Sequence, residues 1–342
     1  MSIRIAVNGF GRIGRLLTRE AVARNEVELV AINSPGDIKT SAHLIKYDSV
    51  HGVYPGTVST KEGNIIVNGQ TIRYFSERNP RNLPWGKLDV DIVIESTGKF
   101  RAREEAELHL QSGARKVIIT APGKGGLDFT VVMGVNHEGY QVDKHHIVSS
   151  ASCTTNCLAP VARVLSEEFG IIKGLMTTIH SYTQDQRILD GSHKDLRRAR
   201  AASMSIVPTT TGAASALGLV LPELQGKLDG MAIRVPTPNV SLIDLTVETD
   251  LPLTAELVNH KLHTASESYL KGVLKYTEEP LVSTDYIGSR HSAIVDGLLT
   301  KTIGDRMVKV IAWYDNEWGY ALRVIDLAVY MGEQFAKLYQ VS

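Results

Sequence analysis

The sequence predicts an α/β fold: a Rossmann-type, doubly wound parallel sheet followed by an α+β domain with a mainly antiparallel sheet. Three observations support this. Short β-rich runs alternate with helical patterns through the first half, a glycine-rich turn joins the first run to the first helix, and longer β-rich segments follow residue 152. A chain of 342 residues also exceeds one ordinary core, so two domains are expected.

The first half begins with a predicted strand, helix and strand. These lie at Ile3–Val7, Arg12–Arg24 and Val27–Ile32. Further strands are predicted at Ile65–Val67, Ile92–Glu95, Lys116–Thr120, Val131–Val135 and His146–Ser149, with a helix at Glu104–Ser112. Because helices separate the strands, parallel pairing with crossover connections is expected.

The second half has a different pattern. Its main predicted strands are Leu175–His180, Met231–Val235, Leu242–Glu248 and Val308–Trp313, with a helix at Ala255–Glu267. A last helix, Tyr320–Tyr339, is long enough to pack back on the first domain. We therefore expect one domain from residues 1–152 and 317–342, and another from residues 153–316.

Composition excludes several classes of protein. Lys and Arg together number 37, as do Asp and Glu, so charge gives no case for nucleic acid or an anionic membrane as the main partner. The sequence shows no signal-peptide pattern and no apolar run near 18 residues, so a protein that is neither secreted nor membrane-spanning is expected. Its two cysteines, Cys153 and Cys157, form no disulfide framework and a poor zinc site, which fits a reducing, cytoplasmic compartment.

A dinucleotide-binding motif follows the first predicted strand. Gly9, Gly11 and Gly14 read G-x-G-x-x-G at the opening of a helix. Gly9 permits the tight turn, Gly11 lets the backbone approach a pyrophosphate, and Gly14 lets the helix pack on the strand. The helix N-terminus would face the phosphates. Residues 1–152 are therefore predicted to bind NAD or NADP.

The end of the second strand lacks the acidic residue that usually binds the adenosine ribose. Ser34 stands there instead, and its uncharged hydroxyl makes NADP admissible because no carboxylate repels a 2′-phosphate. Alternatively, Asp37 or Asn33 holds the ribose of NAD equally well. Lys39 is the nearest cation that could reach a 2′-phosphate.

Cys153 is the candidate nucleophile. It lies between small polar residues at the apparent start of a helix that Ser152 can cap. The helix dipole and free backbone N–H groups are expected to lower the pKa of the thiol and to stabilise an oxyanion. Cys157 precedes Leu158 and Ala159, which favours a small buried side chain without a chemical role.

His180 is the candidate base. It ends the strand Leu175–His180 and precedes the hydroxyl-bearing Ser181 and Tyr182. Spacing alone does not single it out among eleven histidines, most of which are expected to be structural.

Longer motifs resemble a known family. AVNGFGRIGR, HLIKYDSVHG, STGKF, SASCTTNCLAP, TTIHSYTQDQ, HKDLRRARAA, PTTTGAA, RVPTPNVS and WYDNEWGY occur in the order found in glyceraldehyde-3-phosphate dehydrogenases and span nearly the whole chain. SASCTTNCLAP together with PTTTGAA is highly specific. The sequence is therefore identified as similar to the phosphorylating members of this family.

The resemblance implies a mechanism and its residues. Cys153 would attack the aldehyde, His180 would accept the proton, and inorganic phosphate would cleave the resulting thioester to 1,3-bisphosphoglycerate. Two anion subsites are implied. Thr183 and Arg234 match the site for the phosphate of the substrate; Ser152, Thr154, Thr211 and Gly212, with Arg198 nearby, match the site for the attacking phosphate.

Cofactor contacts also carry over. The matching positions are Gly9, Arg12, Ile13, Arg78, Thr97, Thr120 and Asn316, of which Asn316 would bind the nicotinamide amide. Members restricted to NAD usually carry Asp at the position of Ser34 and Pro at that of Ser192, and this sequence resembles the NADP-accepting members at both. The family is a homotetramer in which the Ser192 loop reaches a neighbouring cofactor. We therefore predict a homotetramer that uses NADP as well as NAD, with NADP preferred.

Three alternatives remain open. Erythrose-4-phosphate dehydrogenase shares the scaffold and the cysteine, but resembles this sequence less after His180 and at PTTTGAA. A cysteine hydrolase would need no dinucleotide, so the G-x-G-x-x-G motif between a predicted strand and helix argues against it. A binding protein for nucleic acid or host surfaces gains no support from the neutral charge.

Overall fold

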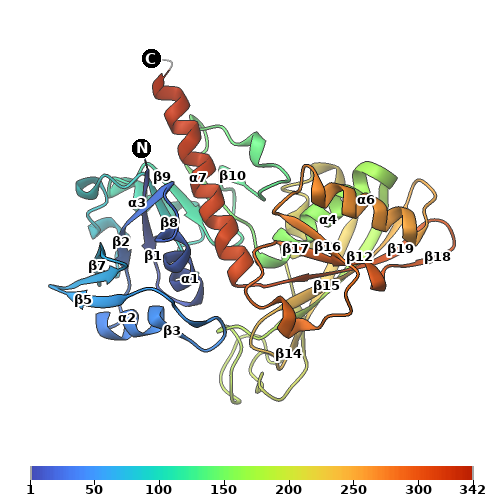
Figure 1. Cartoon of the computed structure of the whole chain (residues 1–342), viewed down its shortest axis with the longest axis horizontal. Coiled ribbons are helices and arrows are strands. Elements are labelled where there is room, and N and C mark those ends of the chain that lie inside the picture. The colour runs from blue at the N-terminus through green and yellow to red at the C-terminus, as the bar shows by residue number, and fades with distance from the viewer. Residues whose placement is uncertain (1, 341–342) are drawn as a thin grey trace. The chain divides into compact units, whose positions relative to one another are not determined.

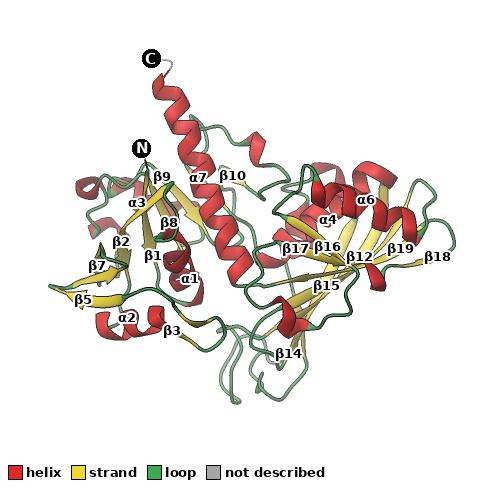
Figure 2. Cartoon of the chain, viewed as in Figure 1, coloured by secondary structure: helices red, strands yellow, loops and turns green. Residues whose placement is uncertain are grey.

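The computed structural model describes residues 2–340, with side chains through residue 335, and forms two compact units (Figure 1). Unit 1 comprises Met1–Met133, His137–Ala151 and Ala321–Ser342, and unit 2 comprises Gly134–Asn136 and Ser152–Tyr320. Each unit has its own sheet (Figure 2).

Unit 1 is built on a nine-stranded sheet in the order β10-β11-β9-β8-β1-β2-β7-β6-β5. Its strands are β1 (Ile3–Asn8), β2 (Val27–Asn33), β5 (Val58–Lys61), β6 (Asn64–Val67), β7 (Gln70–Phe75), β8 (Ile92–Glu95), β9 (Lys116–Ile119), β10 (Phe129–Thr130) and β11 (Ile147–Ser149). Pairing is parallel from β10 through β7 and antiparallel among β7, β6 and β5. The predicted Rossmann-type sheet is confirmed. Strands β3 (Tyr47–Asp48) and β4 (Gly52–Val53) form a separate ribbon.

The helices of unit 1 are α1 (Arg12–Ala21), α2 (Ile38–Lys46), α3 (Arg103–Gln111) and the part of α7 (Trp318–Gln340) from Ala321 onward. Leu16 and Leu17 of α1 are fully buried. Helix α7 runs beside α1 (Figure 1), where Arg24 donates from Nη1 to Asp326 Oδ1 at 2.7 Å. Among the described helices, none has the length and apolar character to span a membrane.

Strand register in unit 1 brings the predicted cofactor residues to one edge of the sheet. Asn8, the last residue of β1, pairs with Asn33 of β2 on one side and with Glu95 of β8 on the other. The carboxyl ends of these strands are therefore level, and β1 lies at the point where the strand order reverses. Open parallel sheets bind dinucleotides at this position.

Unit 2 contains an eight-stranded sheet in the order β13-β14-β12-β15-β19-β17-β16, with β18 added beside β19. Its strands are β12 (Ile171–Ser181), β13 (Val207–Thr210), β14 (Leu228–Val235), β15 (Ser241–Thr249), β16 (Leu274–Thr277), β17 (Ala293–Asp296), β18 (Lys301–Ile303) and β19 (Met307–Tyr314). Only β12–β14 and β16–β17 pair in parallel, so the mainly antiparallel sheet is confirmed.

The helices of unit 2 are α4 (Cys153–Phe169), α5 (Ala213–Leu217) and α6 (Ala255–Glu267). Helices α4 and α6 lie together over the sheet (Figure 2). Along β15 every second residue is buried, because one face of the strand packs under α4. Cys157, Leu158 and Val161 of α4 are fully buried at this interface, as predicted for Cys157.

One predicted strand is wrong. Val131–Val135 is not a strand; only the preceding Phe129–Thr130 pairs with β11. Val131 still donates its N–H to Ser149 O, and Val131 and Val132 are buried, but Gly134 at φ +79° turns the chain away. The apolar run therefore reflects burial and not strand pairing, two states that a short hydrophobic run does not distinguish.

Two other predictions differ in detail. Helix α1 ends at Ala21 and not at Arg24, whose side chain instead pairs with Glu20 and Asp326. Strand β6 does not join the parallel series but sits in an antiparallel meander, because a two-residue turn at Asn68-Gly69, both with positive φ, folds it back on β7.

Gly14→Ala is expected to destabilise unit 1, since a Cβ there would lie 2.1 Å from Gly9 O, an atom of the turn itself. We expect the free energy of unfolding to fall by about 1–3 kcal/mol, the usual effect of overpacking. Urea unfolding measures it. Gly126→Ala is the matched control, because a Cβ at Gly126 meets nothing within 4 Å. Equal stability of the two variants would contradict the packing role of Gly14.

Candidate active site

Cys153 is the first residue of α4. Ser152 caps the helix, accepting the Thr155 N–H on Oγ at 3.0 Å, as predicted. Just before it, Ala151 has φ +56°, a left-handed conformation that is costly for a residue with a Cβ. Strain of this kind concentrates at functional sites, where the surrounding structure maintains it. The half-buried thiol thus stands at the positive end of a 17-residue helix.

His180 faces this thiol. Its Nε2 lies 3.5 Å from Cys153 Sγ. The parallel register of β12 and β14 pairs His180 with Arg234, so both side chains leave the sheet on one face. His180 Nδ1 lies 2.7 Å from the Ser181 carbonyl oxygen and 2.7 Å from Arg234 Nη1. Since the carbonyl only accepts and the guanidinium only donates, only one of these contacts is a hydrogen bond in a given tautomer.

The two tautomers give His180 different roles. With the proton on Nδ1 donated to Ser181 O, Nε2 presents a lone pair to the thiol and can act as a base. With Nδ1 accepting from Arg234, Nε2 carries the proton and can donate to a thiolate. Arg234 Nη1 also donates to Ser181 O at 3.1 Å, so the guanidinium keeps a partner in either case.

Burial shifts both titrating groups of this pair. It lowers the pKa of His180 to about 3, aided by the positive charge of Arg234. It also raises the pKa of the Cys153 thiol, against the opposing effects of Arg234, of Thr154 and of backbone N–H groups. The sequence-based expectation of a lowered thiol pKa is therefore wrong here, because desolvation of the thiolate outweighs the helix terminus.

The PTTTGAA loop lies at the start of α4. Thr155 Oγ1 donates to Ala213 O at 3.5 Å, which brings Thr211 and Gly212 close to Ser152. Arg198 donates from Nε to Thr209 Oγ1 and from Nη2 to Thr210 O, and it also forms an ion pair with Asp185. Hydroxyl, backbone N–H and guanidinium donors of these kinds suit a phosphate dianion.

Thr154, Thr183 and Ser192 are three further predicted residues of unit 2, and each has its own hydrogen-bond partners. The Thr154 hydroxyl lies 2.8 Å from Tyr314 Oη. Thr183 donates its hydroxyl to Gln186 Oε1 at 3.1 Å. Ser192 is exposed, and its carbonyl accepts two hydrogen bonds from Arg187. No described contact joins Thr183 or Ser192 to the Cys153–His180 pair.

Asn316 is held in one orientation. Its Oδ1 accepts from Ser181 Oγ and from Ser241 Oγ, each at 2.8 Å. Because the oxygen is directed at the two serines, the amide Nδ2 points the other way and can donate. Sequence reasoning predicted Asn316 but missed Ser241, whose position in β15 carries no local signal.

In unit 1, Gly9 and Gly14 of the glycine turn have no room for a side chain. A Cβ on Gly9 would lie 2.5 Å from Thr97 N, and Gly14 is similarly closed. Gly11 begins α1 with no capping side chain, and the first turn contains no acidic residue. The N-terminus of α1, which includes Ile13, is therefore available to an anion, and the residues present fit the diphosphate of a dinucleotide.

The remaining predicted residues of unit 1 surround this turn. Thr97 and Thr120 both bond to Glu95, through its carboxylate and its carbonyl. Arg12 forms a bidentate ion pair with Asp48, at 2.6 and 3.1 Å, which orders its guanidinium. Against the effect of burial, hydrogen bonds from His51 and then from Arg12 hold the pKa of the Asp48 carboxyl well below its usual range. Arg78 is exposed.

The end of β2 and the segment after it contain the three candidates for the ribose, Asn33, Ser34 and Asp37. Asn33 uses both ends of its amide on Asn8 and on the backbone of Glu77. Asp37 caps α2 by accepting from Thr40 N–H and its hydroxyl. Ser34 accepts only a 3.3 Å hydrogen bond from Gly36 N–H, so its own proton can be donated. Both bonds to the Asp37 side chain end on Oδ2, so the Ser34 hydroxyl and the exposed Asp37 carboxylate each keep a polar group for an added ligand.

A buried network under the turn was not predicted. Trp85 donates from Nε1 to His109 Nδ1 at 3.0 Å, which places the remaining ring proton on Nε2, 3.1 Å from Glu95 Oε2. Asn8 donates to the same carboxylate oxygen. These residues are spread over 101 positions, so their association could not be found from spacing.

Comparison with known proteins agrees with this geometry. Residues 3–103 match the family described as "Glyceraldehyde 3-phosphate dehydrogenase, NAD binding domain", and residues 152–316 match its C-terminal domain. The chain belongs to the glyceraldehyde-3-phosphate dehydrogenase family.

Full-length relatives support the same assignment. The chain is 58% identical over 334 residues to glyceraldehyde-3-phosphate dehydrogenase of Geobacillus stearothermophilus, covering 98% of this chain and 99% of the relative. It is 56% identical to glyceraldehyde-3-phosphate dehydrogenase 2 of Bacillus subtilis, covering 96% of each chain. It is also 56% identical to that of Trichormus variabilis, covering 97% of this chain and 99% of the relative. As a glyceraldehyde-3-phosphate dehydrogenase family member, the chain is an NAD-dependent oxidoreductase acting on an aldehyde.

The low pKa of His180 predicts how acid affects stability. The folded state favours neutral His180, and this preference stabilises the fold. The stabilisation is complete above the unfolded pKa of about 6.5 and is lost as pH falls toward about 3. Between pH 6.5 and 5.0 we expect His180 to account for a loss of about 2 kcal/mol in the free energy of unfolding.

Urea unfolding at both pH values and one protein concentration measures this loss. His180→Asn should lose less stability than the parent chain over the interval. His260→Asn, at an exposed histidine, serves as the control and should behave like the parent. An identical loss in His180→Asn and the parent would refute the assignment.

Proposed function

We propose that this chain is a phosphorylating glyceraldehyde-3-phosphate dehydrogenase, which oxidises D-glyceraldehyde 3-phosphate with inorganic phosphate and NAD or NADP to 1,3-bisphosphoglycerate. The observation that carries the proposal is the 3.5 Å approach of Cys153 Sγ to His180 Nε2, with Arg234 against the other ring nitrogen. A nucleophile, a base and an anion-binding cation thus occupy one site.

The proposed chemistry follows from these positions. Cys153 Sγ attacks the aldehyde carbon to form a hemithioacetal, and His180 Nε2 accepts the proton. A bound nicotinamide dinucleotide would accept the hydride that leaves this carbon. Inorganic phosphate then attacks the thioester, which yields the acyl phosphate and restores the thiol. The backbone N–H groups of Cys153 and Thr154, at the start of α4, would stabilise the oxyanions.

Substrate binding would adjust the Cys153–His180 pair. The charge of Arg234 is one of the causes that lower the pKa of His180. A phosphate dianion bound to Arg234 would cancel part of that charge and raise the pKa of His180, making it a stronger base. The base would thus strengthen when an anionic substrate is present.

We further propose that NADP is used and preferred. Ser34 supports this, because its hydroxyl can donate while both ends of the Asn33 amide are committed elsewhere. The exposed Ser192 would add a second hydroxyl from a neighbouring subunit.

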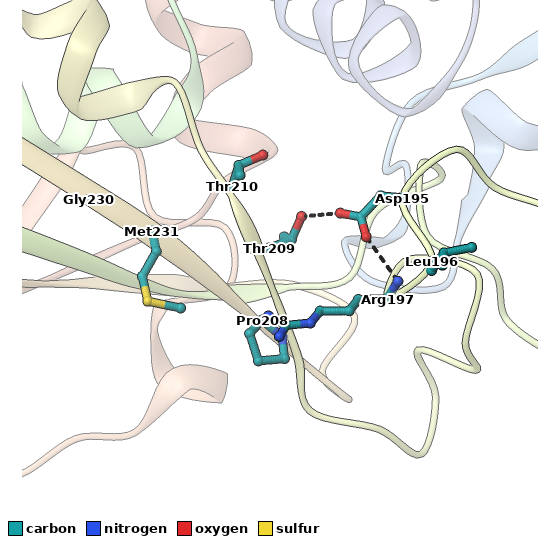
Figure 3. Close-up of a pocket in the computed structure, with 8 residues that line it drawn as sticks. All are labelled: Asp195, Leu196, Arg197, Pro208, Thr209, Thr210, Gly230 and Met231. Carbon is teal, nitrogen blue, oxygen red and sulfur yellow. Dashed lines mark hydrogen bonds between the residues drawn. The ribbon is translucent and has the colours of Figure 1, made fainter.

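A homotetramer is proposed as the working form. Leu189, Leu196, Met204 and Ile206 are each more than two-thirds exposed in and after the loop that carries Ser192. Apolar side chains gathered in this way suit a contact with another copy. Figure 3 shows Leu196 and Met231 beside a hollow on β13 and β14. At its edge Asp195 accepts a hydrogen bond from the Thr209 hydroxyl. The residues that line the hollow include none of Cys153, His180 and Arg234.

Erythrose 4-phosphate is the alternative substrate on the same scaffold. The packing of the Thr211–Gly212 segment at the start of α4 favours acyl-phosphate formation and therefore glyceraldehyde 3-phosphate. A cytoplasmic site of action is proposed because both cysteines are free thiols.

Cys153→Ser is expected to lower kcat for glyceraldehyde 3-phosphate by about 10⁴-fold or more, since no thioester can form. Steady-state turnover with and without inorganic phosphate measures it, and calorimetric titration should show that dinucleotide binding remains. Cys157→Ala is the matched control and should keep its activity. Faster turnover of erythrose 4-phosphate, or turnover independent of phosphate, would instead support the alternative.

Ser34→Asp is expected to lower kcat/KM for NADP by about 100-fold, because the new carboxylate repels a 2′-phosphate. The parent chain should show the higher kcat/KM with NADP than with NAD. Ser59→Asp places the same charge on the exposed strand β5 and should change neither value. A strong preference of the parent chain for NAD would overturn the cofactor assignment.

A further inference from the structure

Glu95 ends β8 next to the glycine turn, and only 1% of its surface is exposed. Thr97 donates its N–H to Glu95 Oε1 at 2.8 Å and donates its hydroxyl to the same oxygen. The other oxygen, Oε2, accepts from Asn8 Nδ2 and lies 3.1 Å from His109 Nε2. One buried carboxylate therefore joins the end of β1, the segment after β8 and helix α3.

Trp85 determines which ring nitrogen of His109 carries the proton. The indole Nε1 can only donate, and it lies 3.0 Å from His109 Nδ1, so Nδ1 accepts. The ring proton is therefore on Nε2, which donates it to Glu95. Trp85 and His109 are both fully buried, so water does not compete with these bonds. The orientation of the Glu95 carboxylate is thus set from the side of α3 as well as from the turn.

Neutral donors alone surround the Glu95 carboxylate. Among the described residues, no lysine or arginine forms an ion pair with Glu95, and its histidine partner is held neutral by Trp85. A carboxylate accepts about four hydrogen bonds, and two from Thr97, one from Asn8 and one from His109 fill these positions. A buried carboxylate is costly without such partners, so the carboxylate and its donors hold one another in place.

The residues that Glu95 holds form a wall of the glycine turn. A Cβ on Gly9 would lie 2.5 Å from Thr97 N, so the backbone of the turn contacts the Ser96–Thr97 peptide. Ser96 donates its hydroxyl to Gly9 O at 2.6 Å and its N–H to Asn8 O at 2.7 Å. Glu95 orients this peptide by accepting the Thr97 N–H. The shape of the turn therefore depends on a carboxylate that has no acceptor position left for a ligand.

The hydrogen-bond chain continues from Asn8 to the end of β2. Asn33 donates from Nδ2 to Asn8 Oδ1 at 2.7 Å, and its amide bonds in both directions to the backbone of Glu77. Glu77 precedes Arg78, a predicted cofactor contact. Glu95 is therefore connected to the expected ribose position as well as to the turn that would hold the diphosphate.

We propose that Glu95 is a positioning residue for the dinucleotide, with His109 orienting its carboxylate. Glu95 holds the Ser96–Thr97 peptide and the Asn8 amide in place in the free protein, so binding does not have to order them. The inference goes beyond the proposed function, since it concerns dinucleotide binding and depends on neither the aldehyde substrate nor a preference for NADP.

Calorimetric titration of the full chain with NAD, without substrate, tests the proposal. Glu95→Gln replaces one carboxylate oxygen by an NH₂ group, which faces either the Thr97 N–H or the donors of Asn8 and His109. Either orientation sets donor against donor. We expect the Kd for NAD to rise about tenfold, as for the loss of one hydrogen bond to a charged group. Alkylation of Cys153 by iodoacetamide without cofactor should proceed at the parent rate, because this thiol belongs to unit 2.

Asp128→Asn is the matched control. Asp128 is a partly buried carboxylate of the same unit, and it accepts from the N–H groups of His146 and Ile147 around the start of β11 and from Arg103. This variant should lose stability in urea without a change in the Kd for NAD. If Glu95→Gln also loses stability but binds NAD as tightly as the parent chain, its role is structural only and the proposal is overturned.

Two variants of His109 keep the test decisive if Glu95→Gln fails to fold. His109→Gln has an acceptor for Trp85 and a donor for Glu95 on one amide, whereas His109→Leu has neither. We expect the Kd for NAD to stay near the parent value in His109→Gln and to rise about fivefold in His109→Leu. Equal Kd values in the two variants would overturn the proposal.

NAD binding and turnover are separate measurements, so the two proposals can fail separately. A parent chain that binds NAD, with variants that show the expected shifts in Kd, supports the role of Glu95 even without turnover of glyceraldehyde 3-phosphate. That absence of turnover would refute the proposed function alone. Turnover by the parent chain together with an unchanged Kd in Glu95→Gln would refute the role of Glu95 alone.

Discussion

The parallel pairing of β12 with β14 is the constraint on which the rest of the active site depends. It places His180 and Arg234 at the same level of one sheet face, so a guanidinium and an imidazole share a few ångströms of buried space. Burial, aided by the positive charge of Arg234, disfavours a second cation there, and the histidine is therefore neutral. Slipping the register by one residue would turn one of these side chains to the opposite face of the sheet.

Helix α4 supplies the nucleophile to this arrangement. The Ser152 cap and the left-handed Ala151 define where the helix starts, while fully buried residues on its inner face hold it against the sheet. Burial alone would make the Cys153 thiol unreactive. Arg234, Thr154 and the helix N–H groups oppose that effect, so the half-buried thiol is surrounded by groups that stabilise its anion.

Unit 1 uses a comparable arrangement for a different ligand. Strand register brings the ends of β1, β2 and β8 level. The buried carboxylate of Glu95 connects Asn8 at the end of β1 with Thr97, and the Glu95 carbonyl accepts from Thr120. At the end of β2 the Asn33 amide is bonded at both ends, whereas the Ser34 hydroxyl accepts one hydrogen bond and can donate its own proton.

The sequence by itself determined the local features. G-x-G-x-x-G after a strand, a Ser-Cys pair at a helix start and the alternation of strands and helices depend on neighbouring residues, and each is found in the structure. Motif resemblance added His180 and Arg234, which spacing alone did not single out. Even so, the local signal misled at Val131–Val135, where an apolar run is buried without pairing as a strand.

Only the tertiary structure decided which distant groups meet. Tyr314 reaches Thr154 across 160 residues, Asn316 takes its orientation from Ser181 and Ser241, and the thiol pKa rises through burial. The physical reason is common to all three. Hydrogen bonds and desolvation between remote segments depend on strand register and helix packing, and no sequence pattern within one segment specifies either.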